Sequence, residues 1–251
     1  MRTVLTIASI CFAIIIGTSC DKDEDDSSKP GPDKVNIGKH QTTLGDFPSN
    51  HYANEVALVV GFTDDIGSSY AGYLQFYDKL TWKQNGSSFV AEFKPSDLNP
   101  EFEGNLSMKI LITDVGQSQS MKMTQTGENE NSVLLTDALT FEGIYTKDAK
   151  SGSFKGYSYT SPTSSYIWGS EDWTTNSGGT KTGTAKYWDN STDSTPDIVE
   201  YELNQDKTGI VIYKPNGVKK FYARWFINGS GEITYYDTAG NSTGTYTWPA
   251  P

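Results

Sequence analysis

Seven aromatic residues between positions 157 and 188 are set among serine, threonine, asparagine and glycine, a composition suited to sugar recognition. The C–H face of a pyranose stacks on a flat ring, while short amide and hydroxyl side chains reach its hydroxyl groups. We predict that a ligand binds at five of these residues: Tyr166, Trp168, Trp173, Tyr187 and Trp188. Trp168 and Trp173 bracket residues 169–172, which we expect to form a loop, and loop aromatics serve function more often than core aromatics do. The alternative is that these rings fill a β core.

A second stretch, residues 189–197, concentrates carboxylate, amide and hydroxyl oxygens. Oxygen ligands of this kind hold Ca²⁺, but the spacing lacks the glycine and the terminal glutamate of an EF-hand loop. An ordinary solvated loop is the favoured interpretation. The sequence therefore predicts neither a metal nor a cofactor.

Catalytic patterns are sparse. The two histidines, His40 and His51, lie in polar N-terminal sequence, without a second ligand at zinc spacing. The sequence has no Gly-x-Ser-x-Gly nucleophile motif and no phosphate-binding glycine loop. A carboxylate pair for glycoside hydrolysis stays open, because 31 acidic residues give no way of choosing two. We predict that the protein is not an enzyme.

The acidic charge of the chain argues against one class of partner, nucleic acids. The chain carries 31 acidic and 20 basic residues, for a formal net charge of −11. Nucleic acids are bound through clustered lysine and arginine, so the sequence excludes them as partners. Aromatic residues make up 13% of the chain, and glycine, serine and threonine are abundant, which is typical of short strands joined by polar turns.

The alternation of apolar and polar residues predicts strands and no helix. The expected strands are 55–62, 70–77, 80–83, 88–93, 106–113, 121–125, 133–141, 153–160, 165–168, 182–188, 198–203, 209–213, 218–227, 232–237 and 243–248. The predicted fold class is all-β: an antiparallel meander, a sandwich or a lipocalin-like barrel, in one or two domains. Residues 39–126 form the N-terminal half and residues 133–251 the C-terminal half. The polar stretch 127–131 between them is either a linker or a hairpin loop.

Residues 1–19 have the features of an export signal: a basic start, an apolar run of about 13 residues and small residues at its end. This run is shorter than the roughly 20 residues that cross a bilayer. Cys11 lies inside the run, so the mature chain keeps Cys20 alone and forms no internal disulfide. Residues 20–38 are acidic and rich in proline and serine, which predicts a disordered tether.

The small residues before Cys20 resemble the lipobox of bacterial lipoproteins, in which that cysteine is acylated and anchors the protein in the membrane. Lys22, Asp23 and Glu24 resemble the export signal of Bacteroidota surface lipoproteins, which implies the outer membrane and an outward-facing body. Residues 198–237, with the turn at 204–209 and the aromatic strand ending at 227, resemble the lipocalin-like domain of such lipoproteins.

These resemblances favour a noncatalytic lipoprotein that binds a glycan at the cell surface, as in starch-utilisation-type systems, with an outer-membrane protein as a further partner. Two alternatives remain open. One is a lipocalin-like carrier or inhibitor with an enclosed apolar pocket, and the other is a structural or adhesive component of a surface assembly.

Overall fold

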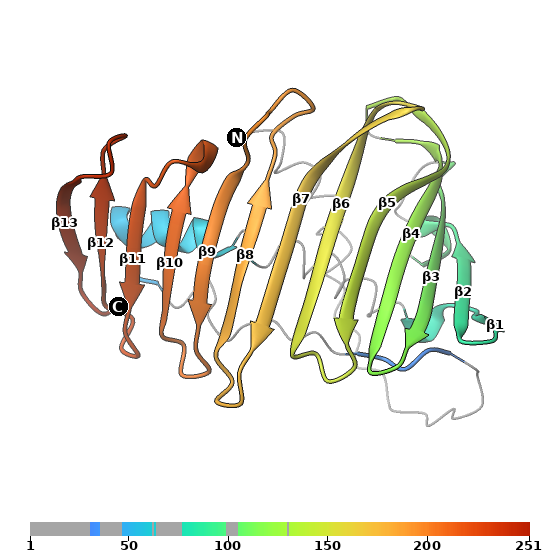
Figure 1. The fold of residues 1–251 in the computed structure, drawn as a ribbon, viewed down its shortest axis with the longest axis horizontal. Helices are drawn as coiled ribbons and strands as arrows, with labels where there is room; N and C mark the ends of the chain where they lie inside the picture. Colours follow the sequence, from blue (N-terminus) through green and yellow to red (C-terminus); the bar gives the residue numbers. More distant parts are fainter. Residues whose placement is uncertain (1–30, 36–46, 62, 64–76, 99–104, 130) are drawn as a thin grey trace.

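A single antiparallel sheet dominates the protein. The computed structural model describes residues 31–35, 47–61, 63, 77–98, 105–129 and 131–251. Within these residues 13 strands follow one another across the sheet in chain order (Figure 1). The strands are β1 Lys83–Asn85, β2 Ser88–Phe93, β3 Ser107–Val115, β4 Ser118–Glu128, β5 Leu134–Thr146, β6 Ser151–Ser161, β7 Ser164–Thr175, β8 Lys181–Tyr187, β9 Asp197–Leu203, β10 Gly209–Lys214, β11 Phe221–Trp225, β12 Gly231–Tyr236 and β13 Ser242–Trp248. The predicted all-β antiparallel meander is confirmed, and the sheet is open, with β1 and β13 as its edges.

Short turns join the strands of the C-terminal half, as the sequence predicts. The β9–β10, β11–β12 and β12–β13 turns repeat one backbone pattern, in which the residue before the turn donates to a carbonyl four residues later. These bonds are Asn204 N to Thr208 O at 2.9 Å, Phe226 N to Ser230 O at 2.8 Å and Asp237 N to Asn241 O at 2.9 Å. Within the stretch 127–131, Gly127 and Glu128 end β4 and pair with Leu135 and Leu134 of β5, so the stretch belongs to a hairpin within one sheet.

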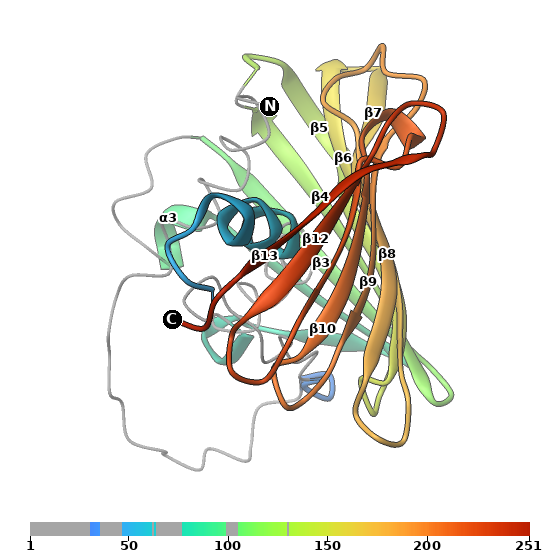
Figure 2. The ribbon, with the colours of Figure 1, turned by 90° about the vertical axis from the view of Figure 1, so that its left-hand side faces the viewer.

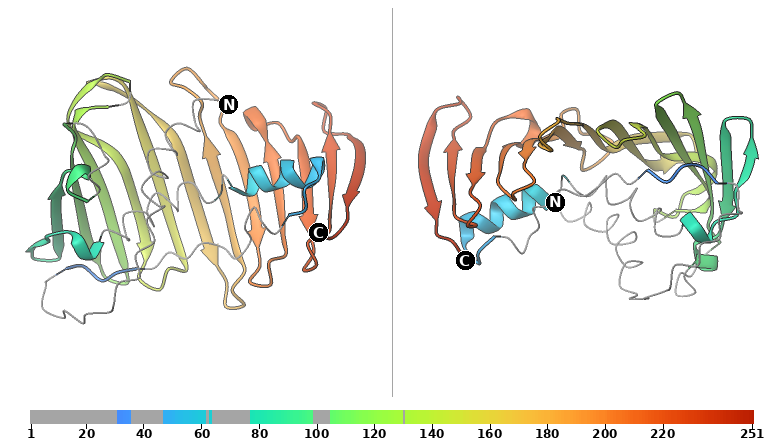
Figure 3. Two further views of the ribbon diagram at one scale, coloured as in Figure 1. Left: turned by 180° about the vertical axis from the view of Figure 1, so that it is seen from behind. Right: turned by 90° about the horizontal axis from the view of Figure 1, so that it is seen from below.

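The sheet bends along its width, and a helix over residues 51–61 lies on its inner side (Figures 2 and 3). The predicted strand 55–62 is wrong, and so is the prediction that the chain has no helix. Ala53, Val56, Ala57 and Val60 are buried at spacings of three and four residues, which is the pattern of one helix face. Asn50 begins the helix, because its Oδ1 accepts a hydrogen bond from Tyr52 N at 2.9 Å. The β-branched valines had favoured a strand, and packing of this face against the sheet overrides that preference.

Glycines on the inner face of the sheet lie opposite aromatic rings on the neighbouring strand. The register pairs are Gly143–Phe154, Gly152–Trp173, Gly183–Tyr201, Gly209–Trp225 and Gly231–Trp248. A Cβ built on any of these glycines would fall 2.1–2.4 Å from the nearest atom of the facing aromatic side chain. Each large ring therefore occupies the space that its partner glycine leaves empty. This repeated pairing explains why the sequence interleaves aromatic residues with glycine.

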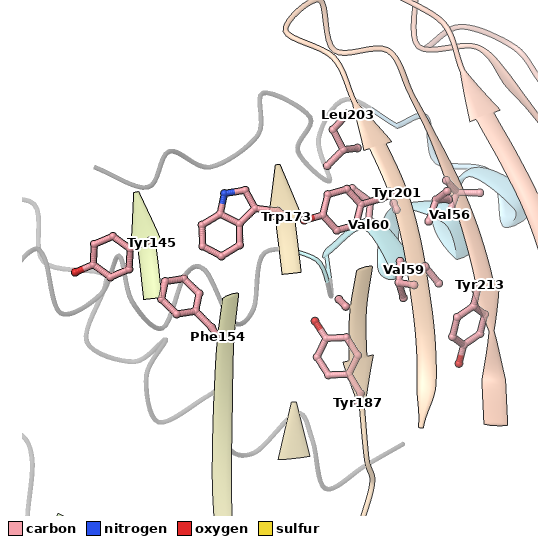
Figure 4. Packing of buried hydrophobic residues seen from close by; sticks show 14 of the residues in the cluster. Val56, Val59, Val60, Tyr145, Phe154, Trp173, Tyr187, Tyr201, Leu203 and Tyr213 are labelled. Carbon is pink, nitrogen blue, oxygen red and sulfur yellow. The ribbon is translucent and has the colours of Figure 1, made fainter. Parts of the chain in front are cut away.

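The rings form a row across the strands at the core. Phe154 lies with its ring centroid 5.9 Å from that of Tyr145 and 5.0 Å from that of Trp173 (Figure 4). Toward the C-terminal half, Val59 and Val60 of the helix lie beside Tyr201 in the same buried cluster. Burial of these large apolar side chains is the main stabilising contribution to the fold.

Several further predictions fall outside the strands or outside the described residues. Residues 31–35 pack against the sheet: Val35 is buried, and Asp33 O accepts a hydrogen bond from Gln119 Nε2 at 3.1 Å. The tether predicted for 20–38 is therefore wrong for these five residues. The predicted strand 80–83 is also wrong, because a 3₁₀ turn, Tyr77–Lys79, precedes it and β1 begins at Lys83. The signal 1–19, Cys20, the segment Lys22, Asp23 and Glu24, His40 and most of the predicted strand 70–77 lie outside the described residues.

Candidate functional site

Two of the five predicted ligand-binding rings lie in the core. Trp173 is 4% exposed and Tyr187 is 6% exposed. Trp173 lies over Gly152, and its ring contacts that of Phe154. No ligand can stack on a ring buried in this way, so these two residues do not form a binding surface.

The predicted loop 169–172 is instead part of β7, and this expectation is wrong. Glu171 at its centre is buried, where its carboxylate accepts a hydrogen bond from Lys181 Nζ at 3.0 Å and another from the Tyr201 hydroxyl. The pattern of polar residues that indicated a loop reflects an internal ion pair. Such a pair is costly to break, because the remaining charge would be buried without a partner.

The other three predicted rings are half-buried. Trp168 packs over Gly156 at a β-bulge in β7, against the core. Trp188 directly follows β8, and its backbone N–H donates to Trp168 O at 3.0 Å. Tyr166 lies in register with Ser158 near the start of β7. The structure thus brings Trp168 and Trp188 onto adjacent backbone, with only part of each side chain exposed.

A different group of aromatic residues lines a groove between the helix over residues 51–61 and the strands β12 and β13. This groove, here called the tyrosine groove, has a volume of about 660 Å³. Its lining combines three tyrosines with polar and apolar side chains from segments distant in the sequence: His51, Tyr52, Asn54, Glu55, Leu58, Lys220, Tyr235, Thr243 and Tyr246. The helix over residues 51–61, which supplies part of this lining, lies on the inner side of the sheet toward its β13 edge (Figure 3).

The three tyrosines form a compact aromatic cluster. Tyr52 and Tyr246 stack with centroids 4.7 Å apart and an interplanar angle of 17°. The Tyr235 ring meets Tyr246 edge to face, with centroids 5.9 Å apart, and is tilted against Tyr52, with centroids 6.4 Å apart. Tyr246 keeps 43% of its surface exposed, so the groove presents an accessible ring held rigidly by its neighbours.

Glu55 fastens the helix to the sheet beside this cluster. Its carboxylate accepts a hydrogen bond from Lys220 Nζ at 2.6 Å and from the Tyr235 hydroxyl at 2.5 Å. Partial burial opposes the charged form of Glu55, but the hydrogen bonds from Lys220 and Tyr235 outweigh it and hold its pKa below the ordinary value. Burial, together with the hydrogen bond to Glu55, raises the pKa of Tyr235. Both groups therefore keep their ordinary ionisation at neutral pH, with Glu55 charged and Tyr235 neutral.

The outer face of the sheet has a second groove, of about 530 Å³, over β7 to β10. Threonines and carboxylates flank two isoleucines there: Asp172, Thr174, Thr182, Thr184, Glu200, Glu202, Ile210 and Ile212. Lys214 Nζ contacts the carboxylate of Glu200. The aromatic residues among its described lining residues, Trp173 and Tyr201, are only 4% and 5% exposed, so this groove lacks the stacking element of a sugar site.

The oxygen-rich stretch 189–197 uses its side chains for local hydrogen bonds. Asp193 accepts from Asn190 N at 3.0 Å, and Asp197 accepts from the Tyr213 hydroxyl at 2.7 Å and from Asn216 N at 2.8 Å. Among the described residues, no three histidine, cysteine or acidic side chains gather as they would around a metal ion. In the same part of the chain, no helix has the length and apolar character that crossing a bilayer requires.

The tyrosine groove was not predicted, although one signal for its helix is present in the sequence. Apolar residues at 53, 56, 57 and 60 follow the helical period, and Asn50 stands where a helix cap belongs. The meeting of Tyr52 with Tyr235 and Tyr246 has no local signal, because more than 180 residues separate them. Comparison with known proteins adds no assignment: no family model matches the chain, and no curated protein is significantly similar to it.

Proposed function

We propose that this protein is a noncatalytic lipoprotein of the outer membrane surface that binds a glycan in the tyrosine groove. The observation that carries the proposal is the exposed ring of Tyr246, stacked on Tyr52 and flanked by hydrogen-bonding side chains. A pyranose places its C–H face on such a ring and its hydroxyl groups against side chains such as Asn54, Lys220 and Thr243. The proposed sugar site is therefore at the β13 edge, and not at the rings of β7 and β8 that the sequence predicted.

The groove supports binding better than hydrolysis. Glycosidases use two carboxyl groups, one of which has a raised pKa so that it can donate a proton. Among the described residues that line the groove, Glu55 is the one carboxylate. Its pKa is lowered, and both of its oxygens accept hydrogen bonds. It is therefore a structural anchor rather than a proton donor.

The site is tested by affinity electrophoresis of the full chain against a panel of polysaccharides. We expect retardation by at least one of them, with no shortening of the polysaccharide after incubation. Tyr246→Ala and Tyr52→Ala should abolish the retardation. Tyr222→Ala, which removes a ring on the outer face of β11, is the matched control and should leave it unchanged. Loss of retardation with Trp168→Ala instead would place the site at β7.

The surface location rests on the sequence of residues 1–24. Cys20→Ala should release the protein from membrane fractions, because the acyl chain is its proposed anchor. Protease treatment of intact cells should digest the wild-type body. Retention of Cys20→Ala in the membrane would contradict the anchor, and protection of the body until lysis would contradict surface exposure.

A further inference from the structure

The β13 edge of the sheet lacks the features that keep strand edges from pairing. β13 has seven residues, Ser242–Trp248, and contains neither charge nor proline. The opposite edge, β1, has three residues and carries Lys83. Proteins commonly protect an edge by shortening it or charging it, and β1 shows both devices. Among the described residues, β12 is the only strand paired with β13.

Alternate residues of β13 direct their backbone N–H and C=O groups away from β12, along the free edge of the sheet. Tyr236 N donates to Lys220 O, and Phe226 N donates to Ser230 O. In the β11–β12 register these bonds mean that the even-numbered residues of β12 bond to β11 through their backbone. Since bonding alternates along an antiparallel strand, Gly244, Tyr246 and Trp248 bond to β12. The N–H and C=O groups of Thr245 and Thr247 therefore point away from the sheet. The 2.9 Å contact between the Thr234 and Thr245 hydroxyls fits the closer side-chain spacing of a non-bonded pair.

The sequence of β13 is complementary to itself when it runs antiparallel through Thr245. In that register Thr245 lies opposite Thr245 of a second copy, and Gly244 lies opposite Tyr246 on both sides. Both kinds of pair already occur inside the sheet. Glycine faces an aromatic ring at Gly231–Trp248, and threonine faces threonine at Thr174–Thr182 and Thr234–Thr245.

We propose that β13 pairs antiparallel with β13 of a second copy of this chain, so that two sheets join into one across a two-fold axis at Thr245. A two-fold contact requires one strand to match itself, and the register through Thr245 satisfies this requirement on both faces. The paired edges extend the main-chain ladder. On the inner face each Tyr246 ring lies over Gly244 of its own strand, so the two rings flank the axis. The two tyrosine grooves then lie on the same side of the joined sheet, on either side of the axis. This association does not depend on the proposed glycan.

A proline substitution tests the contact while keeping the main-chain ladder of the monomer. The N–H of Thr245 points outward, so Thr245→Pro removes the edge bond but no main-chain bond to β12; it also removes the exposed hydroxyl contact with Thr234. By sedimentation velocity over a dilution series, we expect the purified full chain to form a dimer and Thr245→Pro to be a monomer that still unfolds cooperatively on heating. A wild-type monomer at every concentration, or a Thr245→Pro dimer, would overturn the proposal.

Cross-linking tests the register independently. Thr245→Cys places two thiols opposite each other across the axis, within the reach of a disulfide. With diamide as oxidant, membranes carrying Thr245→Cys should yield a covalent dimer on a non-reducing gel. Thr234→Cys, one strand further from the edge, is the matched control and should stay monomeric. Absence of the Thr245→Cys dimer, or equal cross-linking of both variants, would refute the register.

Discussion

Replacement of Gly231 by alanine tests the glycine–aromatic pairing on which the core depends. An added Cβ would lie 2.1 Å from Trp248 Cζ2 and 2.6 Å from Arg224 O. Carbon atoms in contact lie about 3.5–4.0 Å apart, so the indole must move by roughly 1.5 Å. That movement breaks the 3.0 Å hydrogen bond from Trp248 Nε1 to Gly229 O. The carbonyl of Arg224 is backbone and has little freedom to move away.

The expected cost follows from these contacts. Overpacking costs about 1–3 kcal/mol and the lost hydrogen bond about 1 kcal/mol, while the smaller entropy of the unfolded alanine chain offsets about 0.5–1 kcal/mol. The free energy of unfolding should fall by about 1–3.5 kcal/mol, which lowers Tm by roughly 2–14 °C. Urea unfolding should show a lower midpoint with an unchanged slope.

A matched glycine provides the control. Gly178 lies in a turn, where its nearest neighbour to an added Cβ is Asn176 Oδ1 at 3.3 Å. Gly178→Ala should change stability by less than about 0.5 kcal/mol. In a double-mutant cycle, Trp248→Ala should absorb part of the Gly231→Ala cost, with a coupling of about 1–3 kcal/mol. A Gly231→Ala protein as stable as the wild type, or a coupling near zero, would refute the role of the pairing.

Two further predictions concern charged groups and one concerns the core. Because the folded-state pKa of Glu55 is lowered, its charged form stabilises the protein above the ordinary glutamate pKa, and this stabilisation is lost as the pH falls below it. Glu55→Gln should therefore be less stable than wild type at neutral pH, and the difference in free energy of unfolding should narrow in urea titrations repeated at lower pH. A difference that stays constant with pH would contradict this. Glu171→Ala should cost about 3–5 kcal/mol in the free energy of unfolding, because it leaves Lys181 without its buried partner. Asp148→Ala, which breaks the exposed Lys150–Asp148 pair, should cost far less by the same measurement. Trp173→Ala should cost about 3–5 kcal/mol in the free energy of unfolding, and a cost below about 1 kcal/mol would contradict its core position.

The sequence predicted the C-terminal strands better than the N-terminal ones. From β8 to β13 the strands are short, alternate regularly and are separated by asparagine- and glycine-rich turns, so that local chemistry alone sets their bounds. The helix over residues 51–61 was mistaken for a strand, because Val56, Val59 and Val60 favour β structure. Its true pattern is decided by packing against the sheet, which is a tertiary contact.

The binding site illustrates the same limit. Trp173 looked like a loop aromatic because glycine and polar residues surround it, yet Gly152 on the next strand provides the space that buries its ring. Tyr246 looked like an ordinary strand residue. Its importance comes from Tyr52, nearly 200 residues earlier, which the helix brings into stacking contact with it. Sequence alternation predicts which face a ring occupies but not which distant ring it meets.

The most direct test of the proposed function is the dissociation constant of an oligosaccharide cut from a retarding polysaccharide, measured by isothermal titration calorimetry. Wild type, Tyr246→Ala and Trp168→Ala are compared under one buffer. Loss of the stacking surface at Tyr246 should weaken binding by about tenfold or more, which corresponds to about 1.4 kcal/mol. Trp168→Ala should bind as the wild type does. Equal dissociation constants for wild type and Tyr246→Ala would contradict the tyrosine groove as the glycan site.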